Sequence, residues 1–134
     1  MPDRTFTLPE AQALLDETIQ PLAEQLVALC TELEPLQRRW RKILIAIGSN
    51  GGGIDHQQAG DLRERLEQGQ IDVTGLIDEI VAHGVQVKDP AKGLLDFPAV
   101  IDRQPALLCW HVGEPRIAFW HSPEDGFAGR RPLP

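Results

Sequence analysis

Six side chains in the last third of the chain have the types from which a ligand-binding site can be built: Asp96, Glu114, His121, Arg130, Trp110 and Trp120. An aspartate can orient a histidine as a general base, and the same two residues can ligate a metal ion. An arginine such as Arg130 can hold a carboxylate or a phosphate. One interpretation of these residues is therefore a pocket for a small ligand.

The same residues also have a purely structural interpretation, and we favour it. Asp96 and His121 can cap turns or pair with each other. Glu114 can fill a hairpin tip, while Arg130 packs on an aromatic ring. A pocket also needs a geometry that residue types alone do not specify. We therefore predict no catalytic set, no metal ion and no cofactor.

The remaining chemical motifs have plainer interpretations. Residues 38–42 are basic with one tryptophan, which we interpret as cations near the end of a helix rather than a nucleic-acid contact. Residues 48–53 are rich in glycine but lack the Lys-Ser/Thr pair of a nucleotide-binding loop. Cys109 is interpreted as a small buried filler on a strand.

The composition is that of one globular domain with an acidic surface. The chain has 134 residues, 42% of them hydrophobic, and a net charge of −7. An acidic chain repels phosphate backbones, so we expect no nucleic-acid partner. No run is apolar enough to span a bilayer, and residues 1–12 contain no apolar signal segment. The only cysteines, Cys30 and Cys109, indicate reduced thiols, so we expect a cytoplasmic protein that binds no membrane.

A regular apolar repeat organises the first half of the chain. Its members alternate at spacings of four and three residues, the pattern of one stripe along a helix. They are Leu15, Ile19, Leu22, Leu26, Leu29, Leu33, Leu36, Trp40, Ile43 and Ile47. Thr7 and Glu10 predict a capping box at the start of this helix, and Gly48 is its natural end. Pro21 and Pro35 lie inside it, so we expect a continuous helix kinked at both, with two or three shorter helices as the alternative.

A second helix is predicted from its N-cap, Asp55, to a C-terminal glycine, Gly84. Gly69 and Gly75 inside it mark a close approach of helices or a local irregularity. The two helices are expected to form an antiparallel helical hairpin over residues 1–84. The first is about 60 Å long and the second about 43 Å, so part of the first repeat overhangs its partner. We expect the C-terminal region and a second copy of the chain to cover it, giving a homodimer through the first helix.

Residues 85–134 change to an alternating pattern typical of strands. Four strands are predicted, at residues 85–87, 93–100, 106–112 and 116–121, followed by an irregular tail. A turn at residues 113–114 places Leu108 opposite Phe119, so that His111 and His121 lie on opposite faces and share no metal ion unless the strand is bulged. The fold class is thus α+β, a long antiparallel helical hairpin followed by a small antiparallel sheet of three to four strands. All of it lies in one domain, residues 1–134.

Short motifs at both ends of the chain carry a resemblance to a known family. They are residues 6–11 (FTLPEA), 93–99 (GLLDFPA), 108–110 (LCW), 113–115 (GEP), 119–121 (FWH) and 126–127 (GF), with Ile117 and Arg130. In combination they resemble a bacterial family catalogued as domain of unknown function 2203. The resemblance covers nearly the whole chain, and it implies no established activity and no catalytic residues.

Two functions from different classes follow. We expect a cytoplasmic, dimeric scaffold or protein-interaction module without catalytic activity, whose protein partner the sequence does not identify. The alternative is a small enzyme, or a metal- or small-ligand-binding protein, with a pocket between sheet and helices that uses Asp96, His121 and Arg130.

Overall fold

The chain folds into helices followed by a sheet. The structure, a computed structural model, describes residues 4–49 and 53–134. The helical segments are α1 (Leu8–Leu14), a π-helical turn η1 (Leu15–Ile19), α2 (Gln20–Ser49) and α3 (His56–Ala82). The antiparallel strands lie in sequence order: β1 (Gln86–Asp89), β2 (Leu94–Ile101), β3 (Gln104–His111), β4 (Phe119–His121) and β5 (Arg131–Pro132), with a short 3-10 helix η2 (Phe127–Gly129) before β5.

The predicted α+β class is confirmed, whereas the prediction of three to four strands is wrong. The C-terminal tail adds a fifth strand because Arg131 and Pro132 pair with Trp120 and Phe119 of β4. The part of the predicted interhelical loop at residues 50–52 lies outside the described residues. Among the described residues, no helix is both long and apolar enough to cross a membrane.

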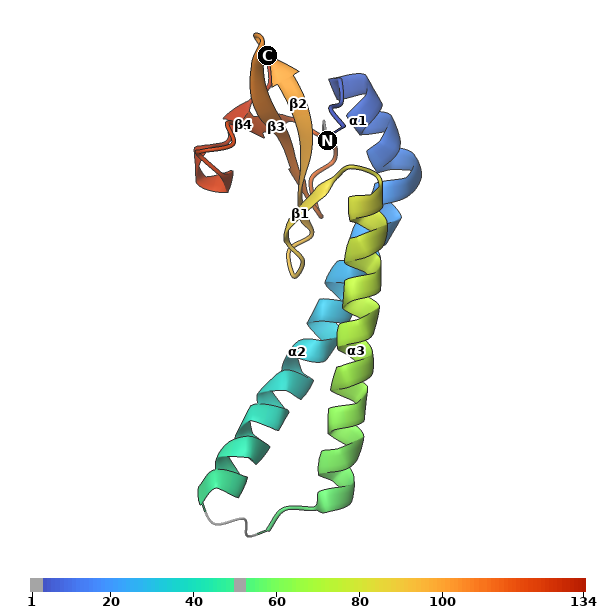
Figure 1. Cartoon of the computed structure of the whole chain (residues 1–134), viewed down its shortest axis with the longest axis vertical. Coiled ribbons are helices and arrows are strands. Elements are labelled where there is room, and N and C mark those ends of the chain that lie inside the picture. The colour runs from blue at the N-terminus through green and yellow to red at the C-terminus, as the bar shows by residue number, and fades with distance from the viewer. Residues whose placement is uncertain (1–3, 50–52) are drawn as a thin grey trace.

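The molecule consists of a head and an arm (Figure 1). The head contains the sheet and α1, and the arm is formed by α2 and α3, which pack against each other. The two arm helices are in contact near the head and diverge toward the far end (Figure 1). The two helices pack tightly at Gly69, where an added methyl group would lie 2.5 Å from a Leu33 side-chain carbon. Gly69 therefore marks a close helix approach, whereas Gly75 faces open space.

The predicted starts of both helices and the end of the second are confirmed by their local contacts, whereas α2 runs through the predicted stop, Gly48, to Ser49. The Glu10 amide donates to the Thr7 hydroxyl at 3.2 Å, and the Thr7 amide donates to the Glu10 carboxylate at 2.8 Å. Asp55 accepts hydrogen bonds from the first amides of α3. Gly84 follows that helix with φ +90°, a conformation that glycine adopts without strain.

The first helix runs through both prolines, but it changes form at the first of them. Pro21 has no amide hydrogen to donate, and its ring crowds the carbonyl of Glu17. The chain relieves this with the π-helical turn η1, in which the Gln20 amide donates to the Leu15 carbonyl five residues earlier. Pro35 lies inside α2, which continues past it. The alternative of two or three separate helices is therefore excluded for residues 8–49.

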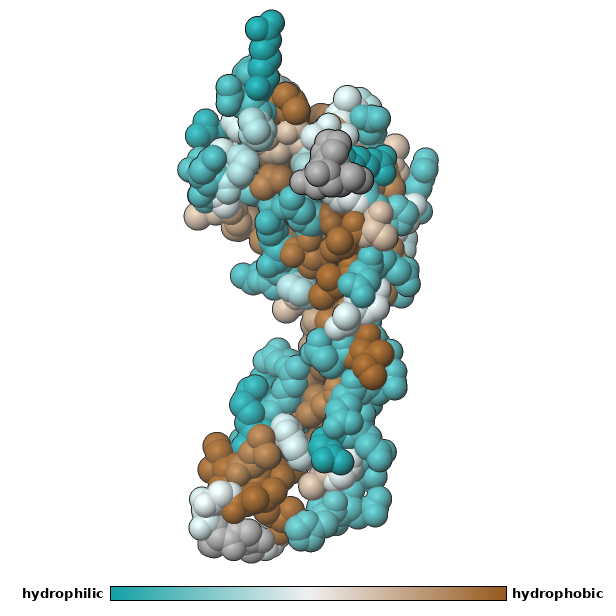
Figure 2. Space-filling model, in the orientation of Figure 1, coloured by the Kyte–Doolittle hydropathy of each residue, from teal (hydrophilic) through white to brown (hydrophobic). Residues whose placement is uncertain are grey.

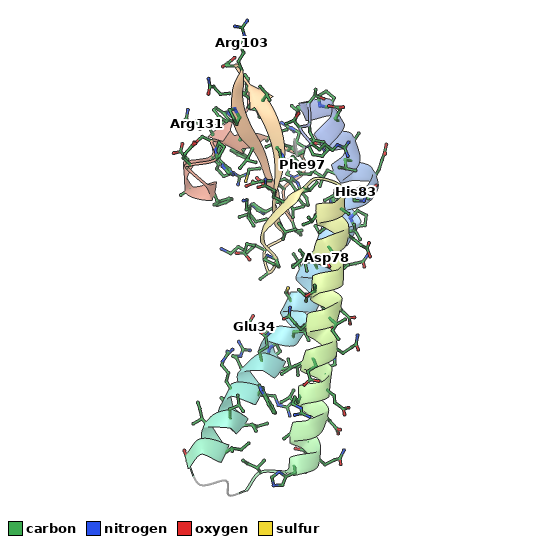
Figure 3. The ribbon with its side chains drawn as sticks, viewed as in Figure 1. Glu34, Asp78, His83, Phe97, Arg103 and Arg131 are labelled. Atoms are coloured by element: carbon green, nitrogen blue, oxygen red, sulfur yellow. The ribbon has the colours of Figure 1, made fainter. Side chains whose placement is uncertain are left out.

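One face of the sheet packs on the first helix to form the core. It contributes Leu95, Phe97, Ala99, Leu108 and Trp110, which meet the helical residues Ala11, Leu15, Ile19, Ala23 and Leu26. Phe97 lies inside the head between sheet and helix (Figure 3) and packs edge-on against Phe6, with ring centroids 5.6 Å apart. The sheet thus covers the N-terminal part of the apolar repeat of the first helix.

The pairing of β3 with β4 differs by one residue from the predicted register. Leu108 lies opposite Trp120, not opposite Phe119. A shift of one residue moves every side chain of a strand to the other face. His111 and His121 therefore share a face, which corrects the prediction that they lie on opposite faces.

Candidate functional site

Three side chains from adjacent strands meet on the sheet face that points away from the helices. Asp96 of β2 lies opposite Cys109 of β3, and His121 of β4 lies opposite Leu107, two residues along the same strand face. All three are buried, with exposed fractions of 1%, 0% and 2%. One ligand atom from each lies within 4.8 Å of the others. We call these three residues the outer-face triad.

The hydrogen bonds of His121 define its orientation. Its Nδ1 lies 2.8 Å from the carbonyl oxygen of Ser122, and its Nε2 lies 3.0 and 3.1 Å from the two carboxylate oxygens of Asp96. A carbonyl only accepts, so Nδ1 carries a hydrogen. The ring then has its second nitrogen aimed at a carboxylate, and a proton or a cation must lie between them.

The third member of the triad, Cys109, is an unreactive thiol in this arrangement. Burial, and next the negative charge of Asp96, raise the pKa of the Cys109 thiol from 9.0 to about 12, although the Arg130 guanidinium opposes part of this rise. A thiol of such a pKa carries almost no thiolate at neutral pH, so it is a poor nucleophile. Only a bound cation would hold it as a thiolate near pH 7.

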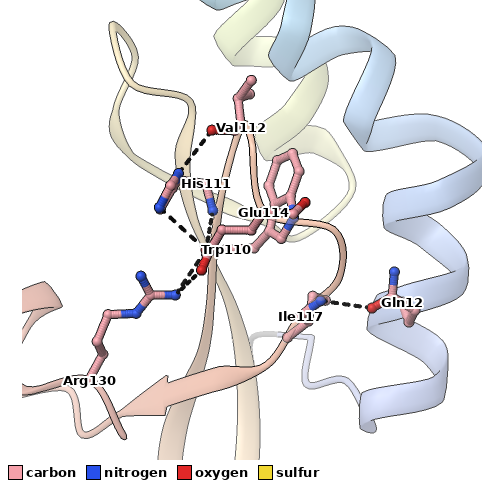
Figure 4. Close-up of polar contacts among 7 residues, drawn as sticks. All are labelled: Gln12, Trp110, His111, Val112, Glu114, Ile117 and Arg130. Carbon is pink, nitrogen blue, oxygen red and sulfur yellow. Dashed lines mark hydrogen bonds and ion pairs between the residues drawn. The ribbon is translucent and has the colours of Figure 1, made fainter. Parts of the chain in front are cut away.

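Glu114 and Arg130 form a separate pair that organises the loop after β3. The guanidinium donates to both carboxylate oxygens of Glu114, at 2.9 and 2.8 Å, and both side chains are about 15% exposed. Glu114 also accepts from the backbone amide of His111 at 3.0 Å (Figure 4). The Arg130 guanidinium carbon lies 4.0 Å from the ring centroid of Phe119 and 4.8 Å from that of Phe127. Arg130 therefore packs on aromatic rings, as the structural interpretation of the sequence predicts.

The two tryptophans lie on the other face of the sheet. Trp110 is fully buried in the core, and its indole N–H donates to the Glu114 carbonyl at 3.1 Å. Trp120 is half-buried against the same core, and the Arg131 guanidinium lies 5.2 Å from its ring. Neither tryptophan lines the outer-face triad.

The six residues predicted from the sequence therefore divide into three groups. The structure brings Asp96 and His121 together, pairs Glu114 with Arg130, and places both tryptophans across the sheet. Asp96 and His121 do not line a pocket between sheet and helices, because they occupy the opposite face. Cys109 was not among the predicted site residues, because the predicted register places it on a different face from His121.

A comparison of the whole chain with known families gives one match. The model of a family described as "uncharacterized conserved protein (DUF2203)" matches residues 4–133. The chain belongs to this family. No curated protein and no solved structure matches it. Membership in DUF2203 confirms the resemblance drawn from the short motifs, and it assigns no activity.

The outer-face triad of this DUF2203 chain offers the donor set of a transition-metal site. An imidazole nitrogen, a thiolate and a carboxylate oxygen are the three ligand types that zinc takes in proteins. The Ser122 carbonyl on Nδ1 is the outer contact that fixes the tautomer of metal-binding histidines, with Nε2 free to bind. The described residues therefore fit a zinc-class ion in both donor type and orientation.

The raised pKa of Cys109 predicts a loss of stability in alkali. Above pH 9 the unfolded chain loses the thiol proton while the folded chain keeps it until about pH 12. The unfolded state then binds fewer protons, so the free energy of unfolding falls as pH rises, by at most about 1.4 kcal/mol per pH unit. Urea unfolding of metal-free protein between pH 8 and 11 measures this slope. Cys109→Ala is expected to flatten it, and equal slopes in the two proteins contradict the prediction.

Proposed function

We propose that this protein binds one zinc-class divalent metal ion through Asp96, Cys109 and His121. The observation that carries the proposal is the convergence of three buried ligand atoms of different chemistry, within 4.8 Å of one another, from three adjacent strands. Two ligands within one loop come together easily, whereas three distant sequence positions, 96, 109 and 121, converge here through strand register alone.

Electrostatics supports a cation at the triad. A buried carboxylate is costly unless it is paired or coordinates a metal. A divalent ion would be held by Asp96 and by the Cys109 thiolate, and the two negative charges would balance its charge. The nitrogen of His121 that faces Asp96 would supply the third bond. The competing arrangement places a proton between His121 and Asp96 and leaves Cys109 as a bystander.

The ligand types favour zinc over the alkaline-earth ions. Calcium and magnesium prefer sites made of oxygen ligands, whereas a thiolate and an imidazole suit zinc and its neighbours in the transition series. Three protein ligands leave one position for a water molecule or a small ligand.

We propose a structural, non-catalytic role for this ion in a cytoplasmic protein. The triad is fully buried, so the ion would cross-link β2, β3 and β4 rather than meet a substrate. A thiolate ligand persists in a reducing compartment, and Cys30 is also a free thiol. In this proposal the ion makes the head a stiff platform on the arm formed by α2 and α3, consistent with a scaffold.

Metal titration tests the proposal directly. Protein purified with a chelator and then desalted is expected to retain one zinc ion per chain after equimolar addition, as measured by elemental analysis. Zinc at one hundred times its dissociation constant is expected to raise the free energy of unfolding by about 2.7 kcal/mol. Cobalt in place of zinc is expected to give a thiolate-to-metal charge-transfer band in the near ultraviolet.

The chain supplies a matched control, because it has a second cysteine outside the triad. Cys109→Ala is expected to abolish the charge-transfer band and most of the metal binding, while Cys30→Ala retains both. His121→Ala is expected to weaken binding as well. Absence of stoichiometric metal in the unmodified protein, or equal loss in the two cysteine variants, would overturn the proposal in favour of the proton-linked pair.

A further inference from the structure

The far end of the arm carries an apolar surface that residues 4–49 and 53–134 leave uncovered. Leu44, Ile45 and Ile47 of α2 are 49%, 70% and 50% exposed. Figure 2 shows a brown, hydrophobic area at the tip of the arm, where α2 ends. We call these three residues the arm-tip surface. Large aliphatic side chains grouped in this way on a soluble protein mark an interaction site.

The two arm helices do not fill the space between them at the tip. A hollow of about 380 Å³ lies there. Its apolar lining residues are Ile43, Ala46, Ile54 and Ala59, and Arg39, Lys42, Asp55 and Gln58 line it with polar groups. Burial along the first helix falls in the same direction. Leu33 is 3% exposed, whereas Ile47 of the same repeat is 50% exposed. The contact between α2 and α3 thus loosens toward the tip, where Leu62 of α3 is still buried at 6% while Ile47 of α2 is exposed.

The charges on the open part of the arm are divided between its two helices. Residues 37–49 of α2 carry four cations and no acid. Residues 55–67, at the start of α3, carry four acids and two arginines. Among the described residues, the cations Arg39, Arg41 and Lys42 form no ion pair with an acid of the same chain. The α2 side is basic and the α3 side acidic.

We propose that a second copy of this chain docks on the arm-tip surface, so that two arms form a four-helix bundle with two-fold symmetry. In the proposed two-fold interface α2 of each copy lies against α3 of the other, so the contact between a basic and an acidic segment occurs twice. The exposed aliphatic side chains then enter the hollow between the helices, as in the core of a helical bundle. An unrelated partner would need an acidic segment opposite α2 and a basic segment opposite α3. A second copy of the chain already carries both segments.

This interface extends beyond the metal proposal, because it uses the opposite end of the molecule from the outer-face triad. It also gives the overhanging repeat of the first helix a partner. The heads then lie at the two outer ends of the pair or side by side, according to the crossing of the arms.

Light scattering coupled to gel filtration tests the proposal on the full chain. The unmodified protein is expected to be a dimer at micromolar concentration. The double variant Ile45→Glu/Ile47→Glu is expected to be a monomer with an unchanged circular dichroism spectrum, because both side chains are exposed and need no repacking. Val100→Glu, a matched change at a 59% exposed site in the head, is expected to remain a dimer.

Charge reversal separates a two-fold arm interface from other modes of association. Arg39→Glu/Lys42→Glu and Asp61→Lys/Glu64→Lys are each expected to shift the protein toward monomer. An equimolar mixture of the two variants is expected to regain dimers. In a mixed dimer the acidic α2 of one variant meets the basic α3 of the other, and the second α2–α3 contact keeps its unmodified residues. A monomeric unmodified protein overturns the proposal, as does a dimer that Val100→Glu breaks and the arm variants leave intact.

Discussion

Replacing Asp96 with alanine is expected to lower the free energy of unfolding of the metal-free protein by about 3–5 kcal/mol, because it removes one partner of a buried pair. The side chains of Asp96 and His121 are both 2% exposed, and Nε2 of His121 lies 3.0 Å from a carboxylate oxygen of Asp96. Without Asp96 the imidazole keeps only its contact with the Ser122 carbonyl, and its second nitrogen faces an apolar hole. Urea unfolding in the presence of a chelator measures the loss.

Two further variants show whether the charge of Asp96 is what matters. Asp96→Asn keeps the shape and one hydrogen bond to His121 while removing the charge, and we expect it to lose less stability than alanine, about 1.5–3 kcal/mol. Glu34→Ala removes an exposed partner of Arg38 and is expected to cost no more than about 0.5 kcal/mol. An Asp96→Ala loss as small as that of Glu34→Ala would show that the buried pair contributes nothing specific.

The features that could be predicted from the sequence are those that local chemistry decides. The capping box of Thr7 and Glu10 and the N-cap Asp55 depend on residues within one turn of each other, and both formed as expected. The same is true of Gly84, which follows the C-cap of α3 and has a positive φ of +90°, a backbone conformation that favours glycine. Hydrogen bonds between residues three or four apart need no knowledge of the rest of the fold.

The response of the first helix to Pro21 could not be chosen from the sequence. A kink, a break and a widened turn all relieve the same clash with the carbonyl four residues earlier. Here Leu15 and Ile19, at the two ends of η1, are both buried against the sheet. Their packing holds the chain helical, so the π-helical turn absorbs the proline, and this depends on residues about eighty positions away.

The predicted register of β4 against β3 is wrong because the connection after β3 is not a two-residue turn. Trp110 donates to the Glu114 carbonyl, and the Ile117 amide donates to the Gln12 side chain on α1 at 2.9 Å. The second contact anchors the loop to a helix one hundred residues earlier, so β4 starts only at Phe119. Loop length sets strand register, and a one-residue shift exchanges the two faces.

The one-residue shift in register also explains why Cys109 was not predicted as a member of the site. With the predicted register Cys109 lies opposite Ala118 and on the other face from His121, so its position suggested nothing but packing. With the actual register Cys109 and His121 share the face that carries Asp96. The residue types of two members were recognised from sequence, and the third became visible only when the strands were aligned. A metal site assembled from three strands is a property of the sheet and not of any motif.

Trp110→Ala is the second large expected loss, about 3–5 kcal/mol in the free energy of unfolding, because a fully buried aromatic side chain leaves a cavity that neighbours fill only in part. The indole sits in the core face of β3, and its N–H also holds the Glu114 carbonyl at 3.1 Å. Its loss therefore affects both the packing on the first helix and the loop that places β4.

Trp110→Phe separates these two contributions. Phenylalanine retains most of the buried apolar volume but cannot donate to Glu114, so we expect a smaller loss, about 1–3 kcal/mol, from the unsatisfied carbonyl and the reduced volume. Trp120→Phe, at a half-buried position on the same face, is the matched control and is expected to cost less than Trp110→Phe. If register depends on the Trp110 contact, amide hydrogen exchange in β4 should rise in both Trp110 variants and stay unchanged in Trp120→Phe. Equal protection of β4 in all three proteins would show that Gln12 and the core fix the loop without the indole.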